Sequence, residues 1–420
     1  MIQPRAWAAT VLAAVVTGVA GCGPAAPPTP GSPQGSPELS MGTSQGPATS
    51  SNPSATQPTP SPTSEGGSLG LRIGALDSAW TVPLLEFASD GEAVIFSSGV
   101  ADGTDSVSAP DLWRYRPGMD QPELLWANPN RDRQLVRIAG DLGTWAFVEI
   151  GVEGERAWDL YLLTGPGETP IHLDTHPGDE DVPSLVPSFT VHGGQIVWTA
   201  FDRGPNGPVS QMFHASGPTW EPRLLAERDA DAAELWLPSL RGSLLAYGEV
   251  IYAADRSTDE RQVHLVDLAE RAFEPQRLDT SGLATMPLVV ADGVIWKETD
   301  PGFSMFNWGR LRHFDAVSGE TSHLTMAPQE YVNYPSAGSR FVAAWGADAF
   351  TFSIGDLELR ESHLLGTYEP ETNENVLRPH VSSDLLVWLH SAQDGLGNGP
   401  PGEIRYAFLP SAGSGRRGVD

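Results

Sequence analysis

A large aromatic residue recurs at nearly constant intervals along this chain, and no other feature constrains the fold as strongly. Each of these residues ends a short run of aliphatic and β-branched residues, and successive members lie 51, 51, 49, 49, 49 and 43 residues apart. They are Phe96, Phe147, Trp198, Tyr247, Trp296, Trp345 and Trp388. A fixed repeat of this length, built from short strands, is typical of a propeller or an array.

Each repeat carries the signals of four antiparallel strands joined by turns. Between Pro187 and Glu227, for example, PSFTVHGGQIVWTA is followed by a polar loop and then by SQMFHASG and PRLLAE. A third strand with alternating polarity follows each aromatic residue. We place the third strands at DLWRY, DLYLL, QMFHA, QVHLV, RLRHF, DLELR and EIRYAF, which begin at Asp111, Asp159, Gln211, Gln262, Arg310, Asp356 and Glu403. Fourth strands are expected around Leu125, Leu173, Leu225, Leu278, Leu324 and Leu365.

The seventh repeat lacks a fourth strand, because little more than PSAGSGRRGVD follows Phe408. The run LRIGALD from Leu71 resembles a strand and has no repeat of its own. We therefore predict an all-β fold over residues 71–410, a β-propeller of seven four-stranded blades in which the N-terminal strand completes the last sheet. This closure removes the exposed edge that an open array would have. Six or eight blades, or tandem sandwiches of unrelated strands, are the alternatives.

The first 22 residues have the pattern of a secretory signal peptide. Arg5 precedes an apolar stretch, and the sequence VAGC at 19–22 resembles a bacterial lipobox, in which cleavage occurs before a cysteine that is then acylated. We predict lipidation of Cys22 and a location at the cell membrane, lipid-anchored and facing outside the cytoplasm. An ordinary signal peptide with an incidental cysteine is the alternative.

Residues 23–70 consist largely of Pro, Ser, Thr, Gly and Gln, with Glu38 and Glu65 as their only charged residues. A segment of this composition buries too little apolar surface to offset the entropy of ordering it. We predict a disordered tether with a mean reach of about 40 Å. Residues 411–420 are predicted to be a flexible tail.

The charge balance disfavours nucleic acids and anionic lipid head groups as partners. The chain has 25 basic and 53 acidic residues, which gives a net charge of −28. Nucleic acids and anionic lipid head groups require clustered Lys and Arg, so neither is expected as a partner. Cys22 is the single cysteine, so packing without a disulfide must hold the propeller together.

The run FASDGEAVIFSS from Phe87 to Ser98, followed by DLWRY and by DLYLLTGPGETPIHLD, resembles the repeat of TolB-like β-propellers. The resemblance covers most of residues 71–410 and is strongest in the first two repeats. It implies the propeller fold and a location in the bacterial envelope. The extra N-terminal domain of TolB itself is replaced here by the predicted tether, so the partners of TolB are not carried over.

The connections after the second and the fourth strand of each blade are expected on the same side of a propeller. These connections are long and rich in Asp and Glu, and long loops on a rigid ring are the usual location of a binding site. The candidate binding residues are Asp174, Asp179, Glu180, Asp181, Asp229 and Asp231, together with the aromatic residues Trp236, Phe303, Phe306 and Trp308. A solvated surface that keeps the protein soluble, with the aromatic residues as caps of the core, is the alternative.

No catalytic or metal-binding motif emerges from the chain. HExxH and a GxSxG nucleophile elbow are absent, and His172 and His176 have a spacing that places both rings on one face only in a helix. A calcium site at 179–181 is conceivable, but the spacing matches no EF-hand loop. We therefore expect no cofactor, no metal and no catalytic residue, and a non-enzymatic module that binds a protein or glycan. The alternative is an enzyme that acts on a polysaccharide or small molecule at the central channel.

Overall fold

The computed structural model describes residues 71–76, 84–98, 111–151, 156–254, 259–270, 272–279, 281–299, 309–326, 330–346, 351–367, 375–391 and 403–410. These residues form antiparallel strands and turns, and no helix occurs among them. It follows that this part of the chain has no helix able to cross a membrane. The predicted signal peptide, tether and tail lie outside the described residues.

The strands follow one another in meanders, which are runs of consecutive antiparallel strands. The first four meanders each form a separate four-stranded sheet. Their strands are β2 (Leu84–Ser89), β3 (Val94–Ser98), β4 (Asp111–Tyr115) and β5 (Glu123–Trp126); β6 (Arg133–Asp141), β7 (Thr144–Gly151), β8 (Trp158–Leu163) and β9 (Ile171–His176); β10 (Phe189–His192), β11 (Gln195–Gly204), β12 (Gly207–Ser216) and β13 (Arg223–Asp229); and β14 (Ala233–Arg241), β15 (Leu244–Tyr252), β16 (Asp259–Asp267) and β17 (Gln276–Arg277).

The fifth and sixth meanders share one eight-stranded sheet, because the pair Gly309–Val332 joins β20 to β22. Their strands are β18 (Ala284–Val290), β19 (Gly293–Thr299), β20 (Gly309–Asp315) and β21 (Thr321–Leu324), then β22 (Val332–Ala337), β23 (Phe341–Gly346), β24 (Thr351–Asp356) and β25 (Glu361–Thr367). The last sheet contains β26 (Asn375–Ser382), β27 (Leu385–Ser391), β28 (Glu403–Phe408) and β1 (Ile73–Ala75).

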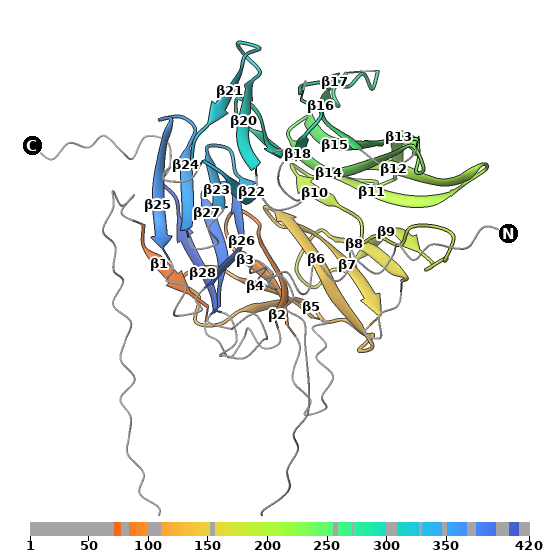
Figure 1. Ribbon diagram of the computed structural model, residues 1–420. Helices are drawn as coiled ribbons and strands as arrows, with labels where there is room; N and C mark the ends of the chain where they lie inside the picture. Colours follow the sequence, from red (N-terminus) through yellow and green to blue (C-terminus); the bar gives the residue numbers. More distant parts are fainter. Residues whose placement is uncertain are drawn as a thin grey trace, which may run out of the picture.

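Strand β1 closes the ring, as predicted. It pairs with β28 over three residue pairs, from Ile73–Ala407 to Ala75–Arg405, and the amide of Leu76 donates one more hydrogen bond, to the carbonyl of Ile404, at 2.9 Å. Figure 1 shows the sheets arranged in sequence around a ring, so that orange β1 lies beside blue β28. The all-β propeller architecture is therefore confirmed. Hydrogen bonding divides the described strands into six sheets rather than the seven separate sheets expected, and the number of blades stays a prediction.

The recurrent aromatic residues occupy the second strands and pack between neighbouring meanders. Trp198 in β11 contacts the second meander in one hydrophobic cluster with Val148 and Leu160, and Tyr247 in β15 contacts the third in a cluster with Val197 and Met212. Apolar surface is thus buried between consecutive meanders, and one large ring in each second strand fills the space between them.

One predicted strand is wrong. DLELR, which begins at Asp356, is not the third strand of its repeat, since that strand is β24 and Asp356 is its last residue. The Asp356 carboxylate accepts the backbone N–H groups of Glu358 and Leu359 at 3.1 and 3.2 Å, which folds the following residues into a turn. The leucines of DLELR imitate strand alternation, but the aspartate at the start of the run acts as a turn residue.

Serine hydroxyls connect the first strands of neighbouring meanders. Ser239 in β14 accepts the N–H of Val289 in β18 at 2.9 Å, and Ser336 in β22 accepts the N–H of Val381 in β26 at 2.9 Å. Both serines follow a proline directly within an irregular segment of the strand, where the pairing with the second strand shifts register. These bulges direct a hydroxyl toward the next meander.

The meander topology divides the connections between two sides of the ring. We call the side that carries the connections after the second and fourth strands the long-loop side. The other side carries the turns between the first and second strands and between the third and fourth strands, and we call it the short-turn side.

Candidate functional site

On the long-loop side, the β11–β12 hairpin joins two acidic connections into one surface. The Arg203 guanidinium near the tip of this hairpin lies 2.7 Å from a carboxylate oxygen of Asp179 and 2.9 Å from one of Asp181 in the preceding connection. The N–H of Ala230 in the following connection donates to the carbonyl of Pro208 in β12 at 3.0 Å. We call this surface the hairpin face, made of Asp179, Glu180, Asp181, Asp202, Arg203, Asp229 and Asp231.

Aspartate side chains hold the two connections in their turns. Asp179 accepts the N–H of Asp181 at 3.0 Å, and Asp229 accepts the N–H of Asp231 at 2.9 Å. This local pattern is the reason that Asp is favoured in such turns. The N–H of Asp181, and then Arg203, hold the pKa of Asp179 below its usual range. Asp179 is therefore ionised at neutral pH.

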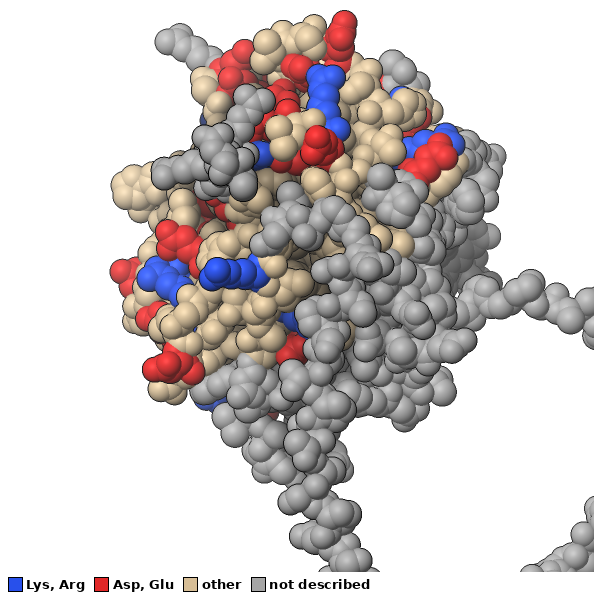
Figure 2. Space-filling view, turned by 90° about the vertical axis from the view of Figure 1, so that its left-hand side faces the viewer, with Lys and Arg blue, Asp and Glu red and all other residues tan. Residues whose placement is uncertain are grey.

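The hairpin face is strongly negative and open to solvent. It carries six carboxylates and one guanidinium, a net charge of −5, and the side chain of Asp181 is 81% exposed. Such a cluster attracts cationic partners and speeds their association. Figure 2 shows another side of the molecule, on which basic and acidic side chains lie next to each other.

Two predicted binding residues are half-buried and make contacts within the fold rather than forming part of this surface. Asp174 is in β9, where its carboxylate accepts the indole N–H of Trp198 from the next meander at 2.7 Å, and burial raises the pKa of Asp174. Trp236 is half-buried in β14 and lies across from Gly248, whose missing side chain leaves room for the indole. The remaining aromatic candidates, Phe303, Phe306 and Trp308, lie outside the described residues.

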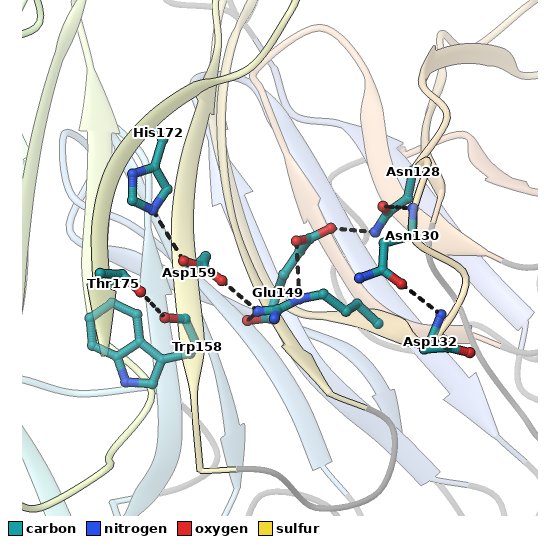
Figure 3. A network of polar contacts seen from close by, with 9 residues as sticks. Asn128, Asn130, Asp132, Glu149, Trp158, Asp159, His172 and Thr175 are labelled. Carbon is teal, nitrogen blue, oxygen red and sulfur yellow. Dashed lines mark hydrogen bonds and ion pairs between the residues drawn. The ribbon is translucent and has the colours of Figure 1, made fainter. Parts of the chain in front are cut away.

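Sequence reasoning missed a partly buried polar network near the long-loop ends of β7 and β8 (Figure 3). Glu149 accepts a hydrogen bond from the amide of Asn128 and forms an ion pair with Arg133 at 3.2 Å. Arg133 also binds Asp159 at 2.7 Å, and His172 lies 3.1 Å from the second oxygen of Asp159. Burial, the largest effect on this carboxyl, raises the pKa of Glu149.

The network joins the first and second meanders, because Asn128 belongs to the connection between them. Each carboxylate in it already has donors within the protein, an arrangement that suits a structural role. A residue that recurs at the same position of several repeats could have revealed this network. Glutamate stands two residues after the recurrent aromatic residue in three repeats, and each of these glutamates pairs with an arginine: Glu149 with Arg133, Glu249 with Arg228 and Glu298 with Arg312.

Two further ionisable groups have an unusual environment. Glu234 in the innermost strand β14 accepts a hydrogen bond from the hydroxyl of Tyr252 at 2.8 Å, and burial raises the pKa of Glu234.

Lys297, the only lysine of the chain, is fully buried near the end of β19. Desolvation lowers the pKa of Lys297 to about 8. Gly309 allows this burial, because a Cβ atom there would lie 2.6 Å from Cγ of Lys297.

The described residues contain no group of three or more His, Cys, Asp or Glu side chains arranged to hold a metal ion. His172 contacts Asp159, as described above, whereas Nδ1 of His176 accepts the N–H of Gly178 at 3.0 Å. The two histidines thus have separate partners.

Comparison with known proteins supports the fold. No protein-family model and no curated protein matches this chain. Among solved structures, an oligogalacturonate lyase in complex with manganese has a TM-score of 0.53 at 12% identity, covering 83% of this chain and 96% of that one. The β-propeller domain of the Trilobed protease from Pyrococcus furiosus has a TM-score of 0.53 at 10% identity, with 73% and 91% covered. That propeller is described as having an open velcro topology, whereas β1 closes the ring here.

A second oligogalacturonate lyase, from Vibrio parahaemolyticus, has a TM-score of 0.50 at 11% identity and covers 81% of this chain and 97% of that one. At these identities the likeness concerns the propeller fold and not the chemistry of any site.

Proposed function

We propose that the protein is a non-enzymatic binding module, and that it recognises a protein or glycan through the hairpin face. The observation that carries this proposal is the joining of two acidic connections by Arg203 and by the Ala230–Pro208 hydrogen bond into one rigid surface of net charge −5. A preformed surface loses little conformational entropy on binding. Its charge favours a partner that carries positive groups at the contact.

The proposal includes a place of action. The lipobox-like sequence before Cys22 and the tether at 23–70 would hold the propeller at a membrane outside the cytoplasm, with a reach of about 40 Å. The TolB-like repeat pattern agrees with such an envelope location. A Cys22→Ser variant should appear in the soluble fraction, and its retention on membranes would contradict lipidation.

One observation favours a second candidate, an enzyme that acts on a polysaccharide or small molecule at the channel. Glu234 lies on the innermost strand near the long-loop side, and a carboxyl group with a raised pKa can serve as a general acid. If the protein is such an enzyme, Glu234→Gln should abolish turnover and leave capture by the hairpin face intact.

The test of the binding proposal is affinity capture from crosslinked cells. One variant replaces Asp179, Glu180, Asp181, Asp229 and Asp231 by Asn or Gln. Its matched control removes five exposed carboxylates from turns between third and fourth strands on the short-turn side, namely Asp120, Glu221, Glu270, Glu274 and Glu320. Both variants lose the same charge, so non-specific electrostatic effects cancel.

We expect specific partners to be recovered by the wild type and by the control, and lost by the hairpin-face variant. If both variants lost the partners equally, the loss would be explained by the change in net charge and not by the hairpin face. Recovery of nothing specific by any of the three would refute a docking role for this face.

A further inference from the structure

A hollow of about 500 Å³ lies on the short-turn side, the opposite side of the ring from the hairpin face. It is formed by turns of the first two meanders and of the last sheet, on both sides of the place where the ring closes. The residues that matter for its chemistry are Glu92, Arg116, Pro117, Leu142, Asp384 and Phe408. Its volume is in the range of sites that bind small ligands or single side chains of a partner.

Leu142 occupies a backbone position that disfavours leucine. It is the first central residue of the two-residue turn between β6 and β7, with φ of 41°, and Gly143 follows with φ of 95°. Turns of this kind favour Asn or Gly. The equivalent positions in the next two meanders are Gly193 and Gly242, with φ of 59° and 57°.

The leucine gains no burial that would offset this strain, because 62% of it is exposed at the hollow. Phe408, at the end of β28, is 51% exposed at the same place. Backbone strain clusters at functional sites, and neighbouring exposed apolar side chains mark interaction sites. The strained Leu142 and the exposed Phe408, beside Pro117, give the hollow an apolar wall.

The hollow is also preformed, and its lining includes carboxylates. The N–H of Leu142 donates to the carbonyl of Asp90 at 3.0 Å, and the N–H of Leu409 donates to the carbonyl of Asp384 at 2.7 Å, so both walls are tied to neighbouring turns. Arg116 pairs with Glu92 at 3.4 Å. Among the described residues, no basic side chain forms an ion pair with the half-buried Asp384 carboxylate. Its electrostatic neighbour is Arg340, whose guanidinium is bound to Asp356, so Asp384 remains available for direct contact beside the apolar wall.

We propose that this hollow binds a peptide segment of a partner protein, in which an apolar side chain lies next to Arg or Lys. The apolar side chain packs between Leu142 and Phe408, and the cation contacts Asp384. The site is independent of the hairpin face and would give the propeller a second binding surface on its opposite side.

The experiment uses the full chain and an immobilised hexapeptide library in which every pair of residues is presented at the two central positions. We expect selection of Leu, Ile, Met or Phe next to Arg or Lys. Leu142→Asn should weaken binding of the selected peptides by about tenfold or more, because the apolar contact is lost. The same change should raise the thermal unfolding midpoint, since asparagine suits the positive φ better than leucine. A merely structural role for Leu142 predicts no loss of binding.

Three further variants make the result decisive. Leu359→Asn removes another exposed leucine from a turn outside the hollow and should bind like the wild type. Asp384→Asn should reduce the preference for Arg and Lys and keep the apolar preference. The hairpin-face variant should bind the peptides normally, which separates this site from the proposed function. Absence of any selected pair, selection of acidic pairs, or unchanged binding by Leu142→Asn would overturn the proposal.

Discussion

Lys297 allows a quantitative prediction about pH. Its ordinary pKa is 10.5, and desolvation lowers the pKa in the folded protein to about 8. Below pH 8 the amine is charged in both the folded and the unfolded state, so folding bears the full cost of burying the charge. Between pH 8 and 10.5 the unfolded chain binds more protons than the folded one, and the free energy of unfolding rises with pH.

The size of this change in unfolding free energy follows from the difference between the two pKa values of Lys297. At 1.36 kcal/mol per pKa unit, the cost at pH 7 is about 3 kcal/mol, of which about 2.5 kcal/mol is relieved by pH 10. We would measure urea unfolding of the wild type, Lys297→Met and Lys297→Arg from pH 7 to pH 10. Methionine carries no charge and arginine remains charged throughout, so both variants should lack this rise, whatever their stability at pH 7.

Differences between the variants isolate Lys297 from other groups. Burial raises the pKa of Tyr406 to about 12, and tyrosines titrating in the unfolded chain near pH 10 lower the stability of all three proteins alike. If the wild type and Lys297→Met had parallel profiles between pH 7 and 10, the amine would not be desolvated as described and the reasoning would be refuted.

Three further changes test contacts between and within sheets. Ser336→Ala removes the acceptor of the Val381 N–H and should cost about 1–2 kcal/mol of unfolding free energy in urea, whereas Ser336→Thr, which keeps a hydroxyl, should cost less. Trp198→Phe leaves the part-buried Asp174 carboxylate without its indole donor, and we expect a loss of about 1–3 kcal/mol at pH 7. The loss should be smaller at pH 4, because the raised pKa of Asp174 makes its carboxyl more protonated there than at pH 7, and an equal loss at both pH values would contradict this account. Gly74→Ala places a Cβ atom against the ring of Tyr406 and should lower the thermal midpoint by several degrees, whereas Ile73→Ser, at a residue 54% exposed, should change it little.

Features that depend on the regular spacing of the repeats could be predicted from the sequence. Burial between meanders requires a large ring in each second strand, so the recurrent aromatic residues mark those strands reliably. The pairing of β1 with β28 was also predictable, because a strand without a repeat and a repeat without a fourth strand leave one solution. DLELR was not predictable in this way, since local hydrogen bonds from backbone N–H groups to the Asp356 carboxylate override an alternating pattern.

The candidate site was less predictable because its contacts join residues distant in sequence. The acidic connections at Asp179 and Asp229 were expected on one side, but the role of Arg203 in joining that surface depends on how far the β11–β12 hairpin extends. Asp174 lies in the same run of acidic residues, but its carboxylate accepts the indole hydrogen bond of Trp198. Charge patterns along a chain do not distinguish a surface carboxylate from one that satisfies a buried donor.

The pairing of β1 with β28 also has a consequence for how the protein is made. Among the described strands, β1 leaves the ribosome first and β28 last, so the contact that completes the last sheet waits until nearly the whole chain has been synthesised. Bringing these distant segments together carries the largest loop-closure entropy in the ring and should be a late step of folding. Until that moment β28 has an unpaired edge, and an unpaired edge is a template for pairing with another chain. The interval between the synthesis of β28 and its pairing with β1 is therefore when the propeller is most exposed to pairing with another chain.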